Sequence, residues 1–231
     1  VDTALTIQRC LPYRVVLSLD LTLDDDKGGT LLNAARENPI RFTAQRLCNF
    51  RLLSNWPLCH HLHPDIILLW RERSTFEPSL ARVVAGNHTF DDERFVRSWI
   101  EVPQCALGAK WVPYEKGGSY QPFLSPTDLV VDWGNDGLEM RTNQIGRYGT
   151  DAQVMQSVSW WRRPGLSYPR ISIGFAPKVL PSRHMFSEKG MCVFPHHDDD
   201  FLPILAVLAS TWVEEMLSAF GRHRAYENSA V

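Results

Sequence analysis

The sequence predicts a mixed α+β fold: a curved, largely antiparallel sheet with flanking helices on one side and a long C-terminal helix packed across it. Two patterns support this prediction. Apolar and polar residues alternate, as in half-buried strands, from Val15 onward, over residues 40–53 and again over residues 171–181. Apolar residues recur at helical spacing over residues 201–220, where a proline lies in the first turn and a glycine follows the last.

Shorter elements are predicted between these segments. Thr30 is a suitable N-cap for a short helix that ends at residue 36. A short strand ends at Gly86, and Thr89 or Asp91 caps the helical segment that follows. Two alternatives stay open for Arg94 and Arg97, which lie three positions apart on that segment. They either contact phosphate or pair with the neighbouring acids, Asp91, Asp92 and Glu93.

Residues 128–150 predict a β-hairpin and a loop. The strand DLVVDW precedes the turn residues Gly134-Asn135-Asp136-Gly137, and LEMR follows as the second strand. The sequence GRYGT at residues 146–150 is typical of a mobile, glycine-flanked loop, and it carries Arg147. Gly174, inside the alternating segment 171–181, indicates a bulge or a close approach of another group.

The composition is that of an ordinary globular chain, with 231 residues, 44% hydrophobic residues and a net charge of -2. We expect one domain over residues 1–231. The five cysteines are scattered and form no CxxC pair, which favours reduced thiols and a cytoplasmic protein. No apolar run approaches 18 residues, so no membrane span is predicted. The chain starts with Val1 instead of methionine, and we expect it to be a fragment of a longer protein.

The basic and aromatic residues concentrate in residues 108–195. Between residues 141 and 190, eight Arg and Lys residues face only Asp151 and Glu188. Trp111, Trp133, Trp160 and Trp161 lie in the same region. A local excess of positive charge interleaved with aromatic side chains favours a polyanion as the partner. A solvated basic face with no ligand is the alternative, and charge alone leaves both open.

Three other groups of residues contain the residue types found in metal-binding or phosphate-binding sites. Histidines 60, 61 and 63 lie beside Cys59, but their spacing matches no tetrahedral metal set. The run HHDDD at residues 196–200 precedes an apolar helix. Carboxylates at the N-terminus of a helix interact favourably with its dipole, which explains this run without a ligand. The sequence KGG at 116–118 allows backbone N–H groups to approach a ligand, although it lacks the ending of a phosphate-binding P-loop.

One ordered series of segments is more specific than any of these motifs. In chain order it contains TFDDERFVRSWIEV, KWVPYEKGGSYQPF, LVVDWGNDGLEM, GRYG, PGLSYPRISIGFAPKVLPSRHMFSEKGMCVF and ILAVLAS. The series resembles the C-terminal part of large bacterial adenine-specific DNA methyltransferases. These are the PglX enzymes of BREX phage defence and the related restriction–modification proteins of the MmeI kind. The resemblance covers residues 42–217, and residues 1–41 lie outside it.

The resemblance implies a target recognition domain, which selects the DNA sequence while a separate domain methylates the N6 atom of adenine. The [DNS]PP[YF] motif that holds the flipped adenine in this family is absent from the sequence, as is a glycine-rich S-adenosylmethionine loop. We therefore expect no catalytic residue and no cofactor in this chain; S-adenosylmethionine belongs to the presumed parent enzyme. The expected partners are double-stranded DNA and the methyltransferase domain of the parent chain. A membrane is not expected to be a partner.

Two departures from the family pattern are visible. Tyr148-Gly149 stands where the family tends to have Arg-Asn, in a loop expected to approach DNA. Ala209 stands where the family has Asn, and we expect the terminal helix to continue intact through it.

The predicted DNA contacts fall into two classes. The phosphates are held by Arg162, Arg163, Arg170, Lys178 and Lys116, and base edges are contacted by polar or aromatic loop residues near Arg141, Asn143, Gln144, Arg147 and Tyr148. The full predicted set is Lys116, Gly117, Gly118, Tyr120, Arg141, Asn143, Arg147, Tyr148, Arg162, Arg163, Arg170, Lys178 and Arg183.

Two other functions stay open at this point. One is a protein-interaction module in which the last helix contacts a partner. The other is a magnesium-dependent nuclease that uses Asp128, Asp132 and Glu139, although Arg141 stands where such a site needs a lysine.

Overall fold

A computed structural model describes residues 14–16, 44–46, 76–220 and 225–226. The chain divides into two compact units, residues 1–74 and 75–231, and each is described by itself. In the first unit, β1 (Arg14–Val16) pairs antiparallel with β2 (Ala44–Arg46). These two strands confirm the strands predicted from Val15 onward and within residues 40–53. The helix predicted at residues 30–36 and the histidines at 60–63 lie outside the described residues. The expectation of one domain over the whole chain stays a prediction.

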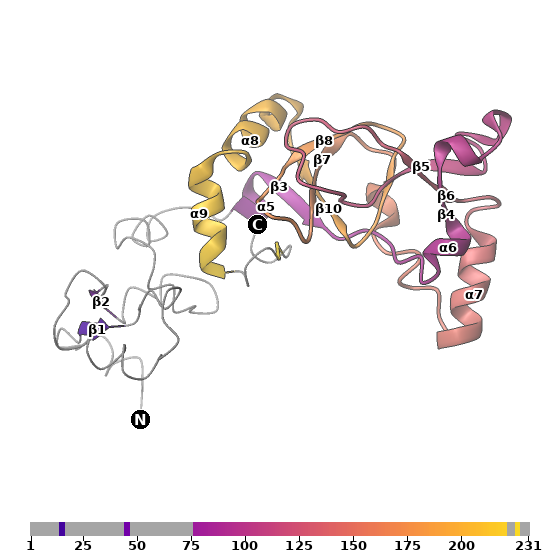
Figure 1. Ribbon diagram of the computed structural model, residues 1–231, viewed down its shortest axis with the longest axis horizontal. Coiled ribbons are helices and arrows are strands. Elements are labelled where there is room, and N and C mark those ends of the chain that lie inside the picture. The colour runs from indigo at the N-terminus through magenta and orange to yellow at the C-terminus, as the bar shows by residue number, and fades with distance from the viewer. Residues whose placement is uncertain (1–13, 17–43, 47–75, 221–224, 227–231) are drawn as a thin grey trace, which may run out of the picture. The chain divides into compact units, whose positions relative to one another are not determined.

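The second unit contains two four-stranded sheets (Figure 1). The first sheet is antiparallel, with the order β3 (Ala81–Val84), β10 (Gly190–Pro195), β7 (Gly165–Pro169) and β8 (Lys178–Leu180). The second has the order β4 (Val96–Ser98), β6 (Leu129–Asp132), β5 (Trp111–Glu115) and β9 (Met185–Phe186). It is mixed, because β9 runs parallel to β5. The predicted α+β class is confirmed, but two sheets replace the single curved sheet.

The helices of the second unit are short. They are α5 (Phe76–Ser79), α6 (Asp92–Phe95), α7 (Leu138–Tyr148), α8 (Phe201–Leu208) and α9 (Thr211–Phe220). Single 3-10 turns cover Trp99–Glu101, Gln104–Ala106, Val158–Trp160 and Asp198–Asp200. The carboxylate of Asp91 caps α6, because its Oδ1 accepts a hydrogen bond from the backbone N–H of Arg94 at 3.1 Å. This confirms one of the two predicted caps.

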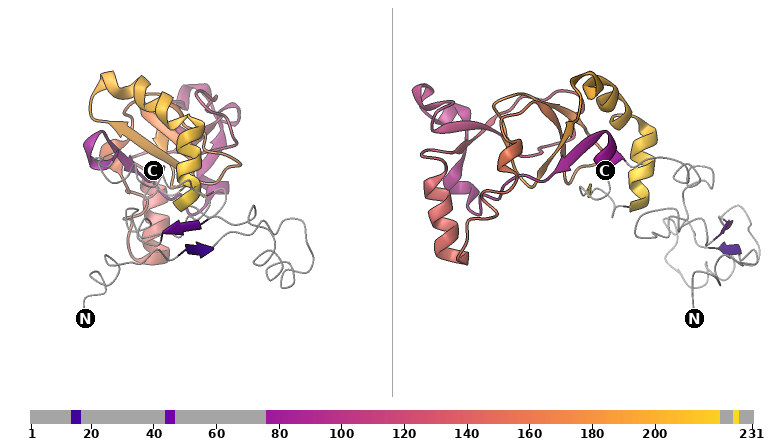
Figure 2. Two further views of the ribbon diagram at one scale, coloured as in Figure 1. Left: turned by 90° about the vertical axis from the view of Figure 1, so that its left-hand side faces the viewer. Right: turned by 180° about the vertical axis from the view of Figure 1, so that it is seen from behind.

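The first sheet forms the middle layer of the second unit, because its two faces pack against different elements. Along β10, Met191 and Val193 face the cluster that contains Leu205 of α8 and Leu217 of α9. The alternating residues Cys192 and Phe194 face the other cluster, which includes the second sheet. Figures 1 and 2 show α8 and α9 on one side of the first sheet, and the second sheet with α7 on the other. The first sheet is therefore buried on both faces.

The predicted hairpin at residues 128–141 is wrong. Its first strand exists as β6, but Leu138–Tyr148 forms the helix α7. Asn135, Asp136 and Gly137 all have positive φ, and α7 starts directly after Gly137, its N-cap. Helical spacing then places Met140 and Gln144 on one buried face.

The mobile loop predicted at residues 146–150 is also wrong. Gly146 to Tyr148 form the last turn of α7, and Gly149 ends the helix with φ 76°. The amphipathic helix α7 thus overrides both the hairpin turn predicted from Gly134 to Gly137 and the loop predicted at residues 146–150.

The predicted long terminal helix is wrong as well, because α8 ends at Leu208 and α9 starts at Thr211. Ser210 marks the break. Its hydroxyl donates a hydrogen bond to the carbonyl of Val207 at 2.6 Å and accepts one from the N–H of Val213 at 3.4 Å. Serine competes with the helix for backbone groups in this way. The helix therefore does not continue through Ala209 as expected.

The alternating segment 171–181 is only partly a strand, because β8 covers Lys178–Leu180 alone. The side chains of Ile171 and Ile173 are 71% and 73% exposed. Gly174 shows the close approach that was one of its two predicted roles, since a Cβ there would lie 2.8 Å from Oε1 of Glu214.

A pair of glycine substitutions tests the helix that replaces the hairpin. Gly146 lies inside α7 with open space around it, so Gly146→Ala should stabilise the protein by about 0.5–1 kcal/mol through helix propensity. Gly137→Ala should destabilise it by about 1–3 kcal/mol, because φ is +69° and the new Cβ would lie 2.6 Å from the Trp133 ring. Urea unfolding of both variants measures these changes. A neutral or destabilising Gly146→Ala would contradict the helix.

Candidate nucleic-acid interface

Three backbone segments meet closely at residues 86–89, 115–118 and 186–190, and we call this meeting point the glycine junction. A Cβ on Gly86 would lie 1.9 Å from the carbonyl oxygen of Phe186. A Cβ on Gly117, where φ is +84°, would lie 2.4 Å from the carbonyl oxygen of Lys189. Hydrogen bonds join the segments, from Asn87 N–H to Phe186 and from Ser187 N–H to Glu115. Only residues without a side chain allow backbones to pack at these distances.

A buried ion pair lies beneath the junction. Nζ of Lys178 lies 3.0 Å from Oε1 of Glu115, and the two side chains are 5% and 7% exposed. The same ammonium donates to the carbonyl of Gly117 at 2.9 Å and to the hydroxyl of Ser125 at 2.8 Å. The carboxylate of Glu115 in turn accepts a hydrogen bond from the N–H of Gly117 at 2.8 Å. The pair therefore fixes both polar backbone groups of Gly117, in the middle of the KGG loop.

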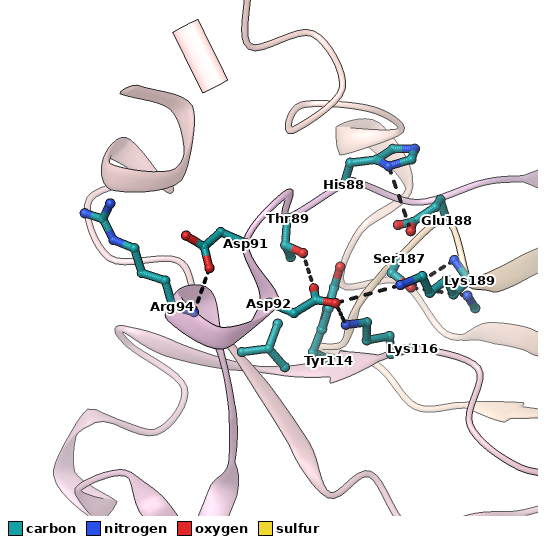
Figure 3. A network of polar contacts seen from close by, with 12 residues as sticks. His88, Thr89, Asp91, Asp92, Arg94, Tyr114, Lys116, Ser187, Glu188 and Lys189 are labelled. Atoms are coloured by element: carbon teal, nitrogen blue, oxygen red, sulfur yellow. Dashed lines mark hydrogen bonds and ion pairs between the residues drawn. The ribbon is translucent and has the colours of Figure 1, made fainter. Parts of the chain in front are cut away.

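Above the junction, polar side chains from three segments converge on the carboxylate of Asp92 (Figure 3). Lys116 forms an ion pair with it, and the hydroxyl of Thr89 donates a hydrogen bond to it. Nζ of Lys189 lies 3.8 Å from the same carboxylate. The side chain of Asp92 is 41% exposed, so solvent reaches the group that these donors surround.

The surroundings of Asp92 and Tyr114 shift the pKa values of both groups. Partial burial alone would raise the pKa of Asp92, but hydrogen bonds from Lys116 and Thr89 and the charges of Lys116 and Lys189 outweigh it. The pKa of Asp92 therefore lies below its ordinary value. Burial raises the pKa of Tyr114 well above its usual range, and its hydroxyl donates to Oδ1 of the buried Asn87 at 2.8 Å.

The helix α7 carries four of the predicted base contacts. Arg147 lies 3.8 Å from the carboxylate of Asp91, and its side chain is 50% exposed. Tyr148 is 59% exposed and packs on Phe90, with ring centroids 5.0 Å apart. Arg141 is held by Asp151 at 2.7 Å, and the amide nitrogen of Asn143 is buried. Arg147 and Tyr148 are thus the more accessible pair.

Two loops bring Arg162, Arg163 and Arg183 together, and we call them the arginine loops. The N–H of Arg162 donates to the carbonyl of His184 at 2.9 Å, and the N–H of Arg183 donates to Arg162 at 3.2 Å. Arg162 and Arg183 both have positive φ, 62° and 73°. The guanidinium of Arg163 lies 5.2 Å from the centroid of the Trp160 ring. All three arginines are exposed, and none forms an ion pair within the part of the chain that the structure describes.

The arginine loops and the glycine junction lie at opposite ends of β7 and β8. Gly165, beside the arginine loops, pairs with Leu180, whereas Pro169 at the other end of β7 pairs with the junction residue Gly190. Five residues of β7 correspond to about 13 Å at a rise of about 3.3 Å per residue.

The remaining predicted contacts differ in their access to solvent. Gly118 and Tyr120 are exposed. Arg170 is half-buried, and its backbone N–H donates to Lys189 at 2.9 Å. Lys178 is 4% exposed, so its ammonium supports the KGG loop and does not reach a phosphate on the surface.

Two of the three acids of the nuclease hypothesis lie in separate ion pairs. Asp132 pairs with Lys110 at 3.1 Å, and Glu139 pairs with Arg94 at 3.2 Å. Arg94 is therefore engaged by an acid other than the three neighbours considered from the sequence. Among the described residues, no three His, Cys, Asp or Glu side chains are gathered so that they could hold a metal ion. Nε2 of His196 contacts the carbonyl of Pro78 at 2.7 Å.

Sequence reasoning missed several members of this site. The sequence indicates Thr89 only as a cap and Asp92 only as a partner for local arginines, and the predicted contacts do not include Glu115, Ser187 and Lys189. The pairing of distant segments at Gly86 and Gly190 brings them together. The signal available in the sequence was the polar and glycine content of GNHT and SEKG, two segments one hundred residues apart.

Comparison with known proteins gives partial similarity to one kind of enzyme. The chain resembles a small part of two adenine-specific methyltransferases. It is 26% identical over 121 residues to BrxX of Escherichia coli O9:H4 (strain HS), a match that covers 50% of this chain and 9% of BrxX. It is 24% identical over 174 residues to PglX of Lacticaseibacillus casei (strain Zhang), covering 70% of this chain and 14% of PglX. The chain thus spans a small fraction of either relative's length. No protein-family model matches it.

Within the described part of the chain, no helix is both long and apolar enough to cross a membrane.

Two lysine substitutions test the buried ion pair. Lys178→Met should destabilise the protein by about 3–5 kcal/mol, because it leaves Glu115 charged, buried and without its cation. Lys189→Met removes the same charge from a side chain that is 57% exposed, and should change stability by less than about 1 kcal/mol. Thermal and urea unfolding measure both variants. Equal effects would show that the pair beneath the junction is not buried in solution.

The depressed pKa of Asp92 predicts a pH dependence of stability. A carboxyl whose pKa is lower in the folded state stabilises the fold at pH values above the unfolded pKa of about 3.9, and that contribution is lost as the pH falls through the folded value. The free energy of unfolding should therefore differ between wild type and Asp92→Asn at pH 7, and the difference should shrink below about pH 4. Chemical unfolding across this range measures it. A difference that stays constant down to pH 2 would contradict the assignment.

Proposed function

We propose that this chain is the sequence-specific DNA-recognition domain of an N6-adenine DNA methyltransferase of the restriction–modification or BREX type. The observation that carries the proposal is the partial similarity to BrxX and PglX, which covers 50% and 70% of this chain. The lack of the adenine-binding and S-adenosylmethionine motifs is consistent with a non-catalytic part of such an enzyme. In this proposal, the cofactor and the flipped adenine bind to the methyltransferase domain of the parent chain.

The arginine loops supply the phosphate contacts. Arg162, Arg163 and Arg183 are exposed, and no carboxylate among the described residues neutralises them. Guanidinium groups bind phosphate oxygens in bidentate geometry, and the Trp160 ring restricts the position of Arg163 before DNA arrives. The glycine junction lies at the other end of β7, a strand of five residues that spans about 13 Å.

The C-terminal end of α7 supplies the base contacts. A helix fits the major groove, and Arg147 and Tyr148 are exposed at its end. Arginine recognises guanine through its O6 and N7 atoms, whereas tyrosine contributes a hydroxyl and an apolar face. Arg141 and Asn143 lie further back on the same helix and contribute less in this proposal.

A protein-interaction module is the second candidate. The observation that favours it is a set of large apolar side chains that are exposed near the C-terminal helices: Ile171, Ile173, Leu202, Val207 and Trp212. Binding to a partner that is insensitive to salt and to competing DNA would support it.

Two arginine substitutions test the proposed roles. Arg163→Ala should weaken binding to every duplex and reduce the slope of log K against log salt by about 0.9, the value for one lost phosphate contact. Arg147→Ala should instead change the relative affinities across a panel of duplexes. Fluorescence anisotropy with labelled duplexes at several salt concentrations measures both.

The matched control is Arg82→Ala, which removes an exposed arginine that already pairs with Glu77 at 2.8 Å. It should leave binding and salt slope nearly unchanged. If Arg163→Ala and Arg147→Ala change only thermal stability, the assigned roles are wrong.

A further inference from the structure

We infer that Lys116, Lys189 and Thr89 form a phosphate-binding site that the carboxylate of Asp92 occupies in the free protein. This inference rests on the proposed function for its physiological ligand, the DNA backbone, but the site itself is defined by its donors. Figure 3 shows that these donors come from different segments and meet at one acidic side chain. Of the three, only Lys116 belongs to the DNA contacts predicted from the sequence, and no local pattern connects it to Lys189 and Thr89.

The donor set matches a phosphate group. Two ammonium groups and one hydroxyl approach the carboxylate of Asp92, and a phosphate oxygen accepts hydrogen bonds from the same groups. Lys116 is adjacent to Gly117, whose backbone both the buried ion pair and the close packing hold in place. Lys189 is adjacent to Gly190 in the same junction. The cations are therefore positioned by the fold and not by Asp92 alone.

Access to the site is open on the side of Asp92. The side chain of Asp92 is 41% exposed and that of Lys189 is 57% exposed, so a ligand reaches them without unfolding the junction. The side chain of Lys116 is 18% exposed and that residue lies deeper. Asp91, the neighbouring acid, is positioned in the same way between the N–H of Arg94 and the guanidinium of Arg147.

The carboxylate lowers the affinity for phosphate in two ways. It satisfies the cations in the free protein, and it repels an approaching anion. DNA that binds only through its backbone must then compete with Asp92, whereas a duplex with matching base contacts has additional binding energy to do so. The arrangement therefore lowers the affinity for the phosphate backbone of any duplex, non-specific binding included.

The test is Asp92→Asn, which keeps the size of the side chain and removes its charge. Random-sequence duplex should bind about two- to fivefold more tightly at low salt, the range expected when exposed ion pairs are released. The slope of log K against log salt should become steeper by about 0.9. The control is Glu93→Gln, which removes the same charge from an exposed neighbour outside the network. It should produce less than half of the gain.

A variant that lacks both lysines shows whether the gain in affinity arises at this site. The gain from Asp92→Asn should disappear when Lys116→Met and Lys189→Met are also present, because no cations remain to be released. Asp92→Ser provides an independent variant, and melting temperatures show that each protein is folded. A gain equal to that of Glu93→Gln, a loss of affinity, or a gain that persists without both lysines would overturn the inference.

Inorganic phosphate separates this inference from the proposed function. Asp92→Asn should raise the melting temperature in phosphate relative to chloride at equal ionic strength, and more than wild type does. Phosphate binding without duplex binding would support the site and contradict the DNA-recognition function. Duplex binding that depends on Arg163 but is unaffected by Asp92→Asn, with no phosphate effect, would overturn the site and leave the function standing. If neither phosphate nor duplex binds, the result contradicts both the site and the DNA-recognition function.

Discussion

The second unit depends on the close approach of three backbone segments at Gly86, Gly117 and Gly190. The distances leave no room for a Cβ on any of the three. The ion pair between Lys178 and Glu115 stabilises this approach, because the pair is almost completely buried and also binds both polar backbone groups of Gly117. A buried pair costs desolvation energy, so its value here lies in fixing one geometry and not in stability alone.

This geometry determines where the charges of the surface lie. The junction places Lys116 and Lys189 beside Asp92, and the strands β7 and β8 place the arginine loops at their other end. The two groups differ in one respect that matters for DNA. The arginines of the loops have no acidic partner among the described residues, whereas the lysines of the junction already contact a carboxylate. In our proposal, both groups supply affinity for the DNA backbone, and the second contributes less because its lysines must first release Asp92.

The sequence predicts the fold class and several strands, because alternation at Val15 and the short strand before Gly86 are local signals. It fails where local and tertiary signals disagree. Gly134 to Gly137 is typical of a hairpin turn, but burial of Met140 and Gln144 favours a helix after it. Ser210 divides a segment with continuous helical periodicity, because its hydroxyl bonds to backbone groups. The network around Asp92 could not be predicted, since Lys189 lies about one hundred residues from Asp92 in the chain and no local pattern connects them. Lys178 illustrates the same limit: its charge counts toward the basic region, but only the fold shows that it is buried.

The most direct test of the central claim is a selection of duplex DNA from a random pool by the isolated chain, at low and then moderate salt. We expect enrichment of a short motif that contains adenine, with binding that weakens as salt rises because phosphate contacts contribute. Absence of binding even at low salt would contradict the claim that this chain recognises DNA.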